Sequence, residues 1–175
     1  MALNSKTLSM MELTIKTYTF LIAILLTGLS AGLFYAWEFS VIPGTKRITD
    51  LSYLETMQSI NRSILNPGFF VIFFGSVLFL IVSTYLQYQE TGVNGIFLMI
   101  LLAALIYLIG TFGVTAFGNV PLNESLDAIN ISTLDSTQLE TLREGYETKW
   151  NRLHTIRTTC SVLSFVSILI SQLFK

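Results

Sequence analysis

The stretch SILNPGFFVIFFGSVLFLIVSTYLQYQ, from Ser63 to Gln89, contains no Asp, Glu, Lys or Arg and decides the fold class. A helix needs about 20 consecutive, mainly apolar residues to cross the ~30 Å hydrocarbon core of a bilayer. Three other stretches of the chain are equally free of charge: Thr17 to Trp37, Thr91 to Asn123 and Thr158 to Phe174. Four such stretches predict an all-α, multi-pass integral membrane protein.

The composition of the chain supports this class. Hydrophobic residues make up 52% and charged residues 12% of the 175 residues, and the mean hydropathy is +0.64. A soluble domain carries about 25% charged residues. The length fits one domain, residues 1–175. A net charge of −1 provides no basic surface, so we expect no nucleic-acid partner. The single cysteine, Cys160, cannot form a disulfide within the chain.

The uncharged stretches define the order of the membrane spans. We place the four spans at roughly 15–38, 67–88, 95–118 and 153–174. The first is interpreted as a retained span and not as a cleaved signal peptide, because its apolar run continues through the bulky residues LFYAW. The turn QETGVN between spans two and three is short, so these helices are expected to be antiparallel neighbours. Both termini then lie on the membrane face of that turn, and the longer connections, 39–66 and 119–152, share the opposite face.

Both long connections are predicted to contain helices. In the first, Asp50 can cap a helix whose apolar positions recur at helical spacing: Leu54, Met57, Ile60 and Ile64. In the second, Asp135 or Ser136 can cap a helix that we expect to run directly into span four. Its apolar stripe comprises Leu139, Leu142, Tyr146, Trp150 and Leu153. The predicted fold is a four-helix membrane bundle with two helical connecting segments forming a cap on one membrane face.

Two features concern partners and orientation. Gly28 and Gly32 form a G-x-x-x-G pattern, which allows close helix packing. We interpret it as packing within the subunit, and a homo-oligomer interface is the alternative. We expect the protein in the cell membrane. The positive-inside rule, applied literally, places the more basic cap face in the cytoplasm, but charges that belong to a site would not count, so the sequence leaves the orientation open.

The most chemically capable segment is KWNRLHTIR, Lys149 to Arg157, directly before the last uncharged stretch. It contains the only histidine of the chain, His154. On a helix, Trp150, His154 and Arg157 share one face, since they follow at spacings of four and three residues. The uncharged residues after Arg157 cover only about 26 Å as a helix. Arg157 is therefore expected at or just inside the apolar boundary, where ionisable groups are costly and mostly paired or functional. The alternative is an Arg157 that reaches lipid headgroups beside an interfacial histidine.

Further polar and aromatic residues are expected at the same face, because the topology brings all four span ends together there. FYAWEF ends span one, SINRS precedes span two and GNVPLNES follows span three. The candidate binding residues are Trp37, Glu38, Asn61, Asn119, Asn123 and Trp150. Together they would form an apolar pocket with a few polar groups, which is the usual composition of a small-molecule site. Taken singly, each asparagine could instead be a turn or cap residue.

His154 and Arg157 are the candidate catalytic residues. A histidine with an ordinary pKa near 6.5 can remove a proton at neutral pH, and a guanidinium and amide N–H groups would stabilise the anion formed. This combination favours proton abstraction from a lipophilic carbon or phenolic acid. No cofactor is predicted; a haem or a mononuclear metal at His154 is the alternative, with few other ligands nearby in the sequence. Hydrolysis is disfavoured, because no nucleophile elbow or Ser-His-Asp order is visible.

The chain resembles the anthrone oxygenase-like family of four-span membrane proteins. The resemblance is carried by AGLFYAWEFSVIPG, MQSINRSILNP, FGNVPLN and WNRLHTIRT, in the order of the family and over roughly residues 28–165. It implies the four-span fold. It also implies an activity like that of the characterised fungal members, which are thought to oxidise anthrones to anthraquinones with O₂ and without a bound cofactor.

The residues and the resemblance together favour a membrane-embedded oxidoreductase that acts on a lipophilic, aromatic small molecule by base-assisted oxidation with O₂. In this hypothesis His154 is the base, Arg157 holds the anion, Asn61, Asn119 and Asn123 orient the substrate, and Trp37 and Trp150 are walls. The alternative is a non-catalytic membrane module that binds a lipid or quinone, or a subunit of a larger membrane complex. Membrane lipid is an expected partner in either case.

Overall fold

The computed structural model describes residues 5–174, with side chains from residue 15 onward. This part of the chain consists of helices joined by short connections and contains no strand. The first rod consists of α1 (Ser5–Ala36), a π-helical turn (Trp37–Val41) and α2 (Ile42–Thr45). The second is α4 (Pro67–Thr91). The third runs from α5 (Gly95–Leu105) through π-helical segments (Ile106–Gly113, Thr115–Asn119) into α6 (Val120–Asp127). The fourth is α7 (Ser136–Ile170), followed by a 3₁₀ turn (Ser171–Phe174).

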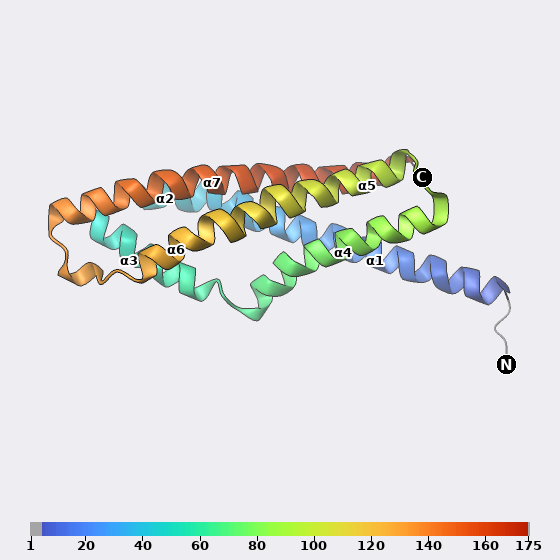
Figure 1. Cartoon of the computed structure of the whole chain (residues 1–175), viewed down its shortest axis with the longest axis horizontal. Coiled ribbons are helices and arrows are strands. Elements are labelled where there is room, and N and C mark those ends of the chain that lie inside the picture. The colour runs from blue at the N-terminus through green and yellow to red at the C-terminus, as the bar shows by residue number, and fades with distance from the viewer. Residues whose placement is uncertain (1–4, 175) are drawn as a thin grey trace.

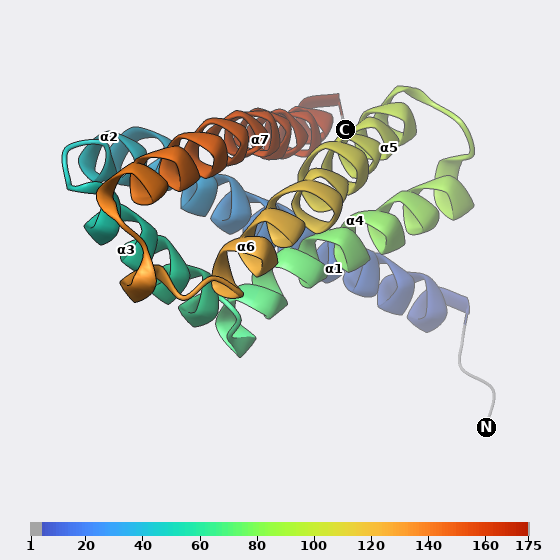
Figure 2. The same ribbon diagram turned by 60° about the vertical axis from the view of Figure 1, so that its left-hand side comes forward.

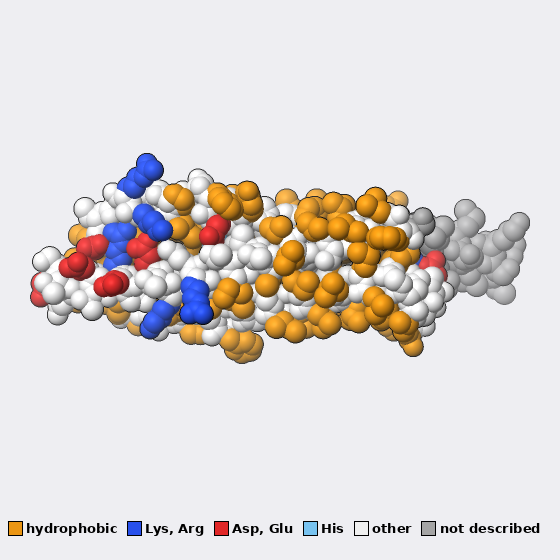
Figure 3. Space-filling view, turned by 90° about the horizontal axis from the view of Figure 1, so that it is seen from above, with side chains coloured by type: hydrophobic (Ala, Val, Ile, Leu, Met, Phe, Trp, Pro, Cys, Tyr) orange, Lys and Arg blue, Asp and Glu red, His pale blue; other side chains and the backbone are white. Residues whose placement is uncertain are grey.

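All four rods are long and apolar enough to cross a membrane, over Ile15–Thr45, Pro67–Thr91, Gly95–Asp127 and Ser136–Phe174. They form an elongated bundle in which α1 packs against α4 and α7, and α5 packs against the same two helices (Figure 1). Large apolar side chains cover the outside of the bundle, as expected for a surface that faces lipid (Figure 3). The prediction of an all-α, four-span membrane protein is confirmed.

The cap lies at one end of the bundle. It contains α3 (Asp50–Ser63), a 3₁₀ turn (Ile131–Thr133), and the first turns of α7, while the α4–α5 connection and the C-terminus lie at the other end (Figures 1 and 2). Acidic and basic side chains gather at the cap end, as Figure 3 shows. A separate apolar cluster holds the cap together: Ile42, Tyr53, Leu54, Met57, Leu126, Ile131, Tyr146 and Trp150. The cap is therefore a packed element, able to hold side chains in defined positions.

Capping residues explain where the helices begin. Asn66 accepts a hydrogen bond from the Phe69 amide at 3.1 Å and Pro67 follows it, which is a favourable start for α4. Asp135 and Gln138 form a reciprocal capping box at α7. The expected cap at Asp50 is displaced by one residue, because the Thr49 hydroxyl accepts from the Ser52 amide instead. Asp50 then lies in the first turn, where its charge complements the helix dipole.

Small and hydroxylated residues mediate the helix contacts inside the bundle. The Ser30 and Tyr107 hydroxyls are hydrogen-bonded at 2.7 Å, and the Ser164 hydroxyl donates to the Ala103 carbonyl at 2.7 Å. Because lipid chains are as apolar as the helices, close packing and such bonds drive association within a membrane. Gly28 lies against Phe165 of α7, where an added Cβ would be 2.9 Å from the ring, whereas Gly32 has no atom within 4 Å of that position. The Gly28 half of the G-x-x-x-G pattern therefore packs within the subunit.

A close contact between the third rod and α7 gives a testable prediction. Gly110 lies directly against Cys160 of α7, so an alanine at position 110 would place its Cβ on the cysteine side chain. We expect Gly110→Ala to destabilise the protein by about 1–3 kcal/mol, the usual effect of overpacking. Thermal unfolding of detergent-solubilised protein measures this, with Gly32→Ala as the matched control. Combining Gly110→Ala with Cys160→Ala, which removes the Sγ atom, should cost less than the sum of the two single substitutions. Additive losses would place the strain elsewhere.

Candidate functional site

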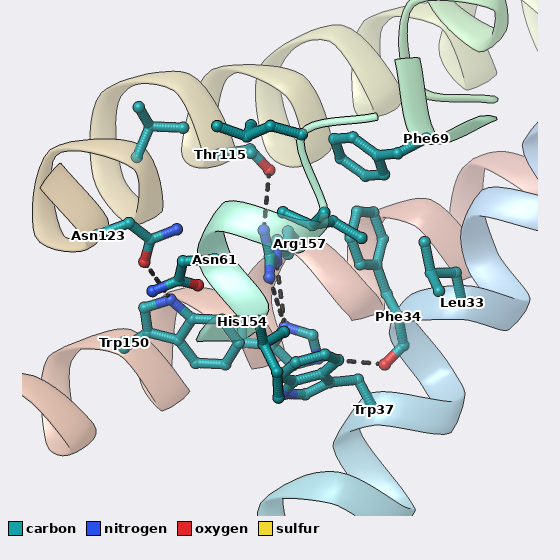
Figure 4. Close-up of a pocket in the computed structure, with 14 residues that line it drawn as sticks. Leu33, Phe34, Trp37, Asn61, Phe69, Thr115, Asn123, Trp150, His154 and Arg157 are labelled. Carbon is teal, nitrogen blue, oxygen red and sulfur yellow. Dashed lines mark hydrogen bonds between the residues drawn. The ribbon is translucent and has the colours of Figure 1, made fainter. Parts of the chain in front are cut away.

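A pocket lies where the cap meets the bundle, and all four rods contribute to it. Its lining, drawn in Figure 4, is Leu33, Phe34, Trp37, Ile60, Asn61, Ile64, Leu65, Phe69, Thr115, Val120, Asn123, Trp150, His154 and Arg157. The regular helix α7 supplies Trp150, His154 and Arg157 from one face, as the spacing predicted. The other lining residues come from the ends of the spans and from α3. The pocket lies at the membrane face of the two long connections, where the sequence predicted a site.

His154 is completely buried and both of its ring nitrogens have partners. Its Nδ1 lies 3.1 Å from Nε and 2.8 Å from Nη2 of Arg157. A guanidinium has only N–H donors, so Nδ1 must be the unprotonated acceptor. The proton of the neutral ring is therefore on Nε2, which donates to the Phe34 carbonyl oxygen at 3.1 Å. The structure thus assigns the tautomer of His154, with its basic lone pair turned toward Arg157.

Arg157 is a buried cation without a carboxylate partner among the described residues. Its exposed fraction is 8%, and it takes part in no ion pair in that part of the chain. The guanidinium lies between two aromatic rings, 4.6 Å from the Phe34 centroid and 5.1 Å from the Trp150 centroid. Its Nη1 reaches the Thr115 hydroxyl only at 3.5 Å. Cation–π contacts stabilise the charge in part, but the positive charge is not neutralised.

Aromatic rings hold His154 in place. Trp150 stacks on its imidazole with a centroid distance of 5.0 Å and an interplanar angle of 7°. Trp37 lies 5.8 Å from Trp150 and 6.3 Å from His154, and Phe34 meets the imidazole edge-on at 5.9 Å. These contacts leave the ring little rotational freedom. The predicted wall residues Trp37 and Trp150 both line the pocket.

The predicted asparagines form part of a hydrogen-bond network around Tyr146. Asn61 Nδ2 donates to the Tyr146 hydroxyl at 3.1 Å, and this hydroxyl donates to Asn123 Oδ1 at 3.0 Å. The Trp150 indole N–H donates to the same Asn123 oxygen at 2.9 Å. Asn61 Oδ1 and Asn123 Nδ2 have no such bond among the described residues, and both residues line the pocket. One acceptor and one donor therefore remain for a ligand.

Two candidate binding residues do not line the pocket. Asn119 is 1% exposed and donates to the Trp150 carbonyl oxygen at 3.3 Å, so it acts between α7 and the third rod. Glu38 lies behind His154, with Oε2 3.7 Å from Nε2, and its Oε1 accepts from the Thr155 hydroxyl at 2.9 Å. Both lie within π-helical turns: Glu38 in Trp37–Val41 and Asn119 at the end of Thr115–Asn119. Such a turn holds more residues than an α-helical turn and so changes the direction of the following side chains.

The pocket includes residues that the sequence did not single out. Thr115, Phe34 and Phe69 line it, and Tyr146 supports its amides although it was expected only in an apolar stripe. Phe34 lies three residues before Trp37 in the quoted FYAWEF segment, and this helical spacing is the one signal that could have identified it. Nothing in the sequence distinguishes Thr115 from the other hydroxyls of span three. Its role depends on the π-helical path of that rod.

The pocket is narrow. Its cavity volume is about 80 Å³, whereas small-molecule pockets usually measure about 300–1,000 Å³. Leu65, 62% exposed at the α3–α4 junction, lies at the opening together with the half-buried Ile64 and Phe69. A ligand with several rings needs these apolar side chains to move apart. Beyond Asn61 and Asn123 the opening meets a surface hollow that carries the Arg62–Asp127 ion pair, whose Nε–Oδ1 distance is 2.6 Å.

The site offers few ligands for a metal. No group of three or more His, Cys, Asp or Glu side chains is close enough to hold one among the side chains described, residues 15–174. His154 would have to give up its bond to Arg157 or to the Phe34 carbonyl before either nitrogen could bind a haem or metal. The residues present therefore fit a metal or haem centre poorly.

Comparison with known proteins agrees with the geometry. The family model described as anthrone oxygenase matches residues 69–167. The chain belongs to the anthrone oxygenase family. No curated protein and no solved structure matches it.

The matched region of this anthrone oxygenase family member includes part of the pocket. Within residues 69–167 lie Thr115, Asn123, Trp150, His154 and Arg157. Trp37, Glu38 and Asn61 lie outside the match, and only the tertiary structure brings them to the same site. The family and the four apolar rods together make the protein an oxygenase-like membrane protein.

Proposed function

We propose that this protein is a cell-membrane oxidoreductase that oxidises a lipophilic aromatic compound with O₂ in the pocket between cap and bundle. The observation that supports this most directly is Arg157, a buried guanidinium with no carboxylate partner among the described residues, beside the neutral imidazole of His154. A buried charge without a counterion is costly. It is best explained by an anion that arrives with, or forms from, the ligand.

The proposed chemistry begins with proton removal. Nδ1 of His154 takes a proton from an acidic benzylic carbon or a phenol, while the Arg157 guanidinium turns from Nδ1 to the anion that results. Asn61 Oδ1 and Asn123 Nδ2 orient the polar end of the substrate, and Trp37 and Phe34 contact its rings. The electron-rich carbanion or phenolate then reacts with O₂. For a benzylic methylene group, the overall reaction with O₂ yields a carbonyl group and water.

A second candidate function is a binding module for a lipid or quinone. The free Asn61 Oδ1 and Asn123 Nδ2 atoms and the aromatic lining of the pocket favour it, because they can hold a polar headgroup or a quinone ring without any proton transfer. In that case Arg157 would hold an anionic or carbonyl group of the bound molecule. The two functions differ in whether O₂ is consumed.

Both tryptophans of the chain line the pocket, so intrinsic fluorescence reports its occupancy. We expect at least one member of a panel of anthrones, quinols and phenols to change this fluorescence saturably and to be oxidised, and for an anthrone we expect uptake of one O₂ per methylene group converted to a carbonyl. The measurement requires purified protein in detergent, an oxygen electrode and product analysis by mass spectrometry. Saturable binding without O₂ uptake for every compound would favour the binding module, and no binding at all would contradict both functions.

A further inference from the structure

The position of Glu38 behind His154 has a consequence for the proton that the base removes. Its Oε2 atom is buried, has no hydrogen-bond partner among the described residues, and lies 3.7 Å from Nε2 of His154. Nε2 is on the opposite side of the imidazole from Nδ1, which faces Arg157 in the pocket. A carboxylate oxygen without a donor is costly to bury. His154 therefore lies between the unbonded Oε2 atom of Glu38 and the guanidinium of Arg157, which has no carboxylate partner among the described residues.

His154 cannot easily keep a second proton. A doubly protonated ring would carry a positive charge beside the guanidinium of Arg157, in a site lined mainly by apolar and aromatic side chains. Like charges at such short range, removed from water, repel strongly. If the proton that arrives at Nδ1 is matched by one that leaves Nε2, the imidazole stays neutral throughout.

Resting on the function proposed above, we infer that Glu38 is the proton acceptor behind His154, so that the imidazole relays the proton and does not store it. The substrate proton moves to Nδ1 and the Nε2 proton moves to Oε2 of Glu38. Glu38 changes from carboxylate to carboxylic acid, His154 changes tautomer, and the substrate becomes an anion beside Arg157. The negative charge thus passes from Glu38 to the substrate, and no new charge is created in the site. Glu38 acts through His154 and is a positioning and relay residue.

Local structure holds Glu38 in this position and leaves it a path to the outside. The Thr155 hydroxyl, one residue after His154, donates to Oε1 at 2.9 Å and so directs Oε2 toward the ring. Proton transfer needs the 3.7 Å separation to close to about 2.6–3.2 Å. It also needs the Nε2–H group to turn from the Phe34 carbonyl oxygen, which it contacts at 3.1 Å, toward Oε2. Glu38 lies in the π-helical turn Trp37–Val41, a type of distortion that is frequent at functional sites. Its side chain is 21% exposed although Oε2 itself is buried, so a rotation of the carboxyl group would bring the proton to the exposed side.

Anaerobic hydrogen–deuterium exchange tests the relay separately from the reaction with O₂. The probe is the compound of the panel that the wild-type protein oxidises fastest, incubated in D₂O under argon and analysed by mass spectrometry. Glu38→Gln keeps the acceptor for Thr155 and the size of the side chain, but it cannot take up a proton. We expect it to slow enzyme-dependent exchange at least about tenfold, since a lost general base costs ~10²–10⁴-fold, while substrate affinity by tryptophan fluorescence is unchanged. Formate should restore exchange to Glu38→Gly, which a merely structural role would not permit.

The controls separate this inference from the function on which it rests. Glu144→Gln removes an exposed carboxylate of α7 and should exchange as the wild type does. Wild-type rates in Glu38→Gln, or no effect of formate on Glu38→Gly, would overturn the relay and leave the proposed function standing. An absence of exchange by the wild-type protein with every compound would overturn the proposed function and the relay together.

Discussion

His154→Asn is expected to lower the rate of substrate oxidation by about 10²–10⁴-fold, the range for loss of a general base. The asparagine carbonyl oxygen can still accept a hydrogen bond from Arg157, so the guanidinium is not left without its acceptor. It cannot take up a proton. Single-turnover oxidation with protein in excess over substrate measures the chemical step, and tryptophan fluorescence measures whether the substrate still binds.

Ser161→Ala is the matched control for this variant. Ser161 is buried on the same face of α7, one turn beyond Arg157, and its hydroxyl donates only to the Thr158 carbonyl at 2.9 Å. Loss of this hydroxyl should leave the oxidation rate unchanged. An active His154→Asn protein would remove His154 from the mechanism, and an inactive Ser161→Ala protein would attribute the losses to packing of α7.

Arg157→Met is expected to lower kcat/KM by about 10²–10³-fold, the usual cost of removing one group that stabilises a developing anion. Methionine retains much of the apolar volume between Phe34 and Trp150 but removes the charge. Removal of a costly buried charge is offset by loss of the donors to His154 Nδ1, so the thermal midpoint should change little. Lost activity together with retained stability in Arg157→Met would show that the charge of Arg157 serves the reaction and not the folded structure.

Arg157→Lys separates charge from geometry. A lysine keeps the charge but presents a single ammonium group in place of the planar fork, which contacts His154 through both Nε and Nη2. We expect an activity between those of the wild type and Arg157→Met. A large drop in the thermal midpoint of Arg157→Met, with normal activity in the molecules that remain folded, would instead make Arg157 a structural residue.

The bundle and one wall of the site could be predicted from the sequence. Uncharged stretches long enough to cross a bilayer specify the spans with little ambiguity, and the structure contains four such rods. Trp150, His154 and Arg157 share a face because α7 is a regular helix from Ser136 to Ile170. In a regular helix, the spacing of residues along the chain determines the direction in which each side chain points from the helix axis.

Side-chain directions near the π-helical turns could not be predicted in this way. At 3.6 residues per α-helical turn, one additional residue rotates everything after it by about 100°. Glu38 therefore lies behind His154 and Asn119 lies beneath Trp150, although both were expected in the pocket. The same turns bring Thr115 toward Arg157. Helical periodicity alone carries no signal for a π-helical turn, because such turns are stabilised by contacts with other helices.

The sequence by itself determined the membrane class, the order of the spans and the end of the bundle at which the polar residues meet. These properties follow from local hydrophobicity and chain length. Only the tertiary structure decided the tautomer of His154, the absence of a carboxylate beside Arg157 within the described residues, and the position of Glu38. Those properties depend on how residues of the first rod, α7 and the third rod come together in space, and the relative placement of distant parts of the chain is not encoded in any single segment.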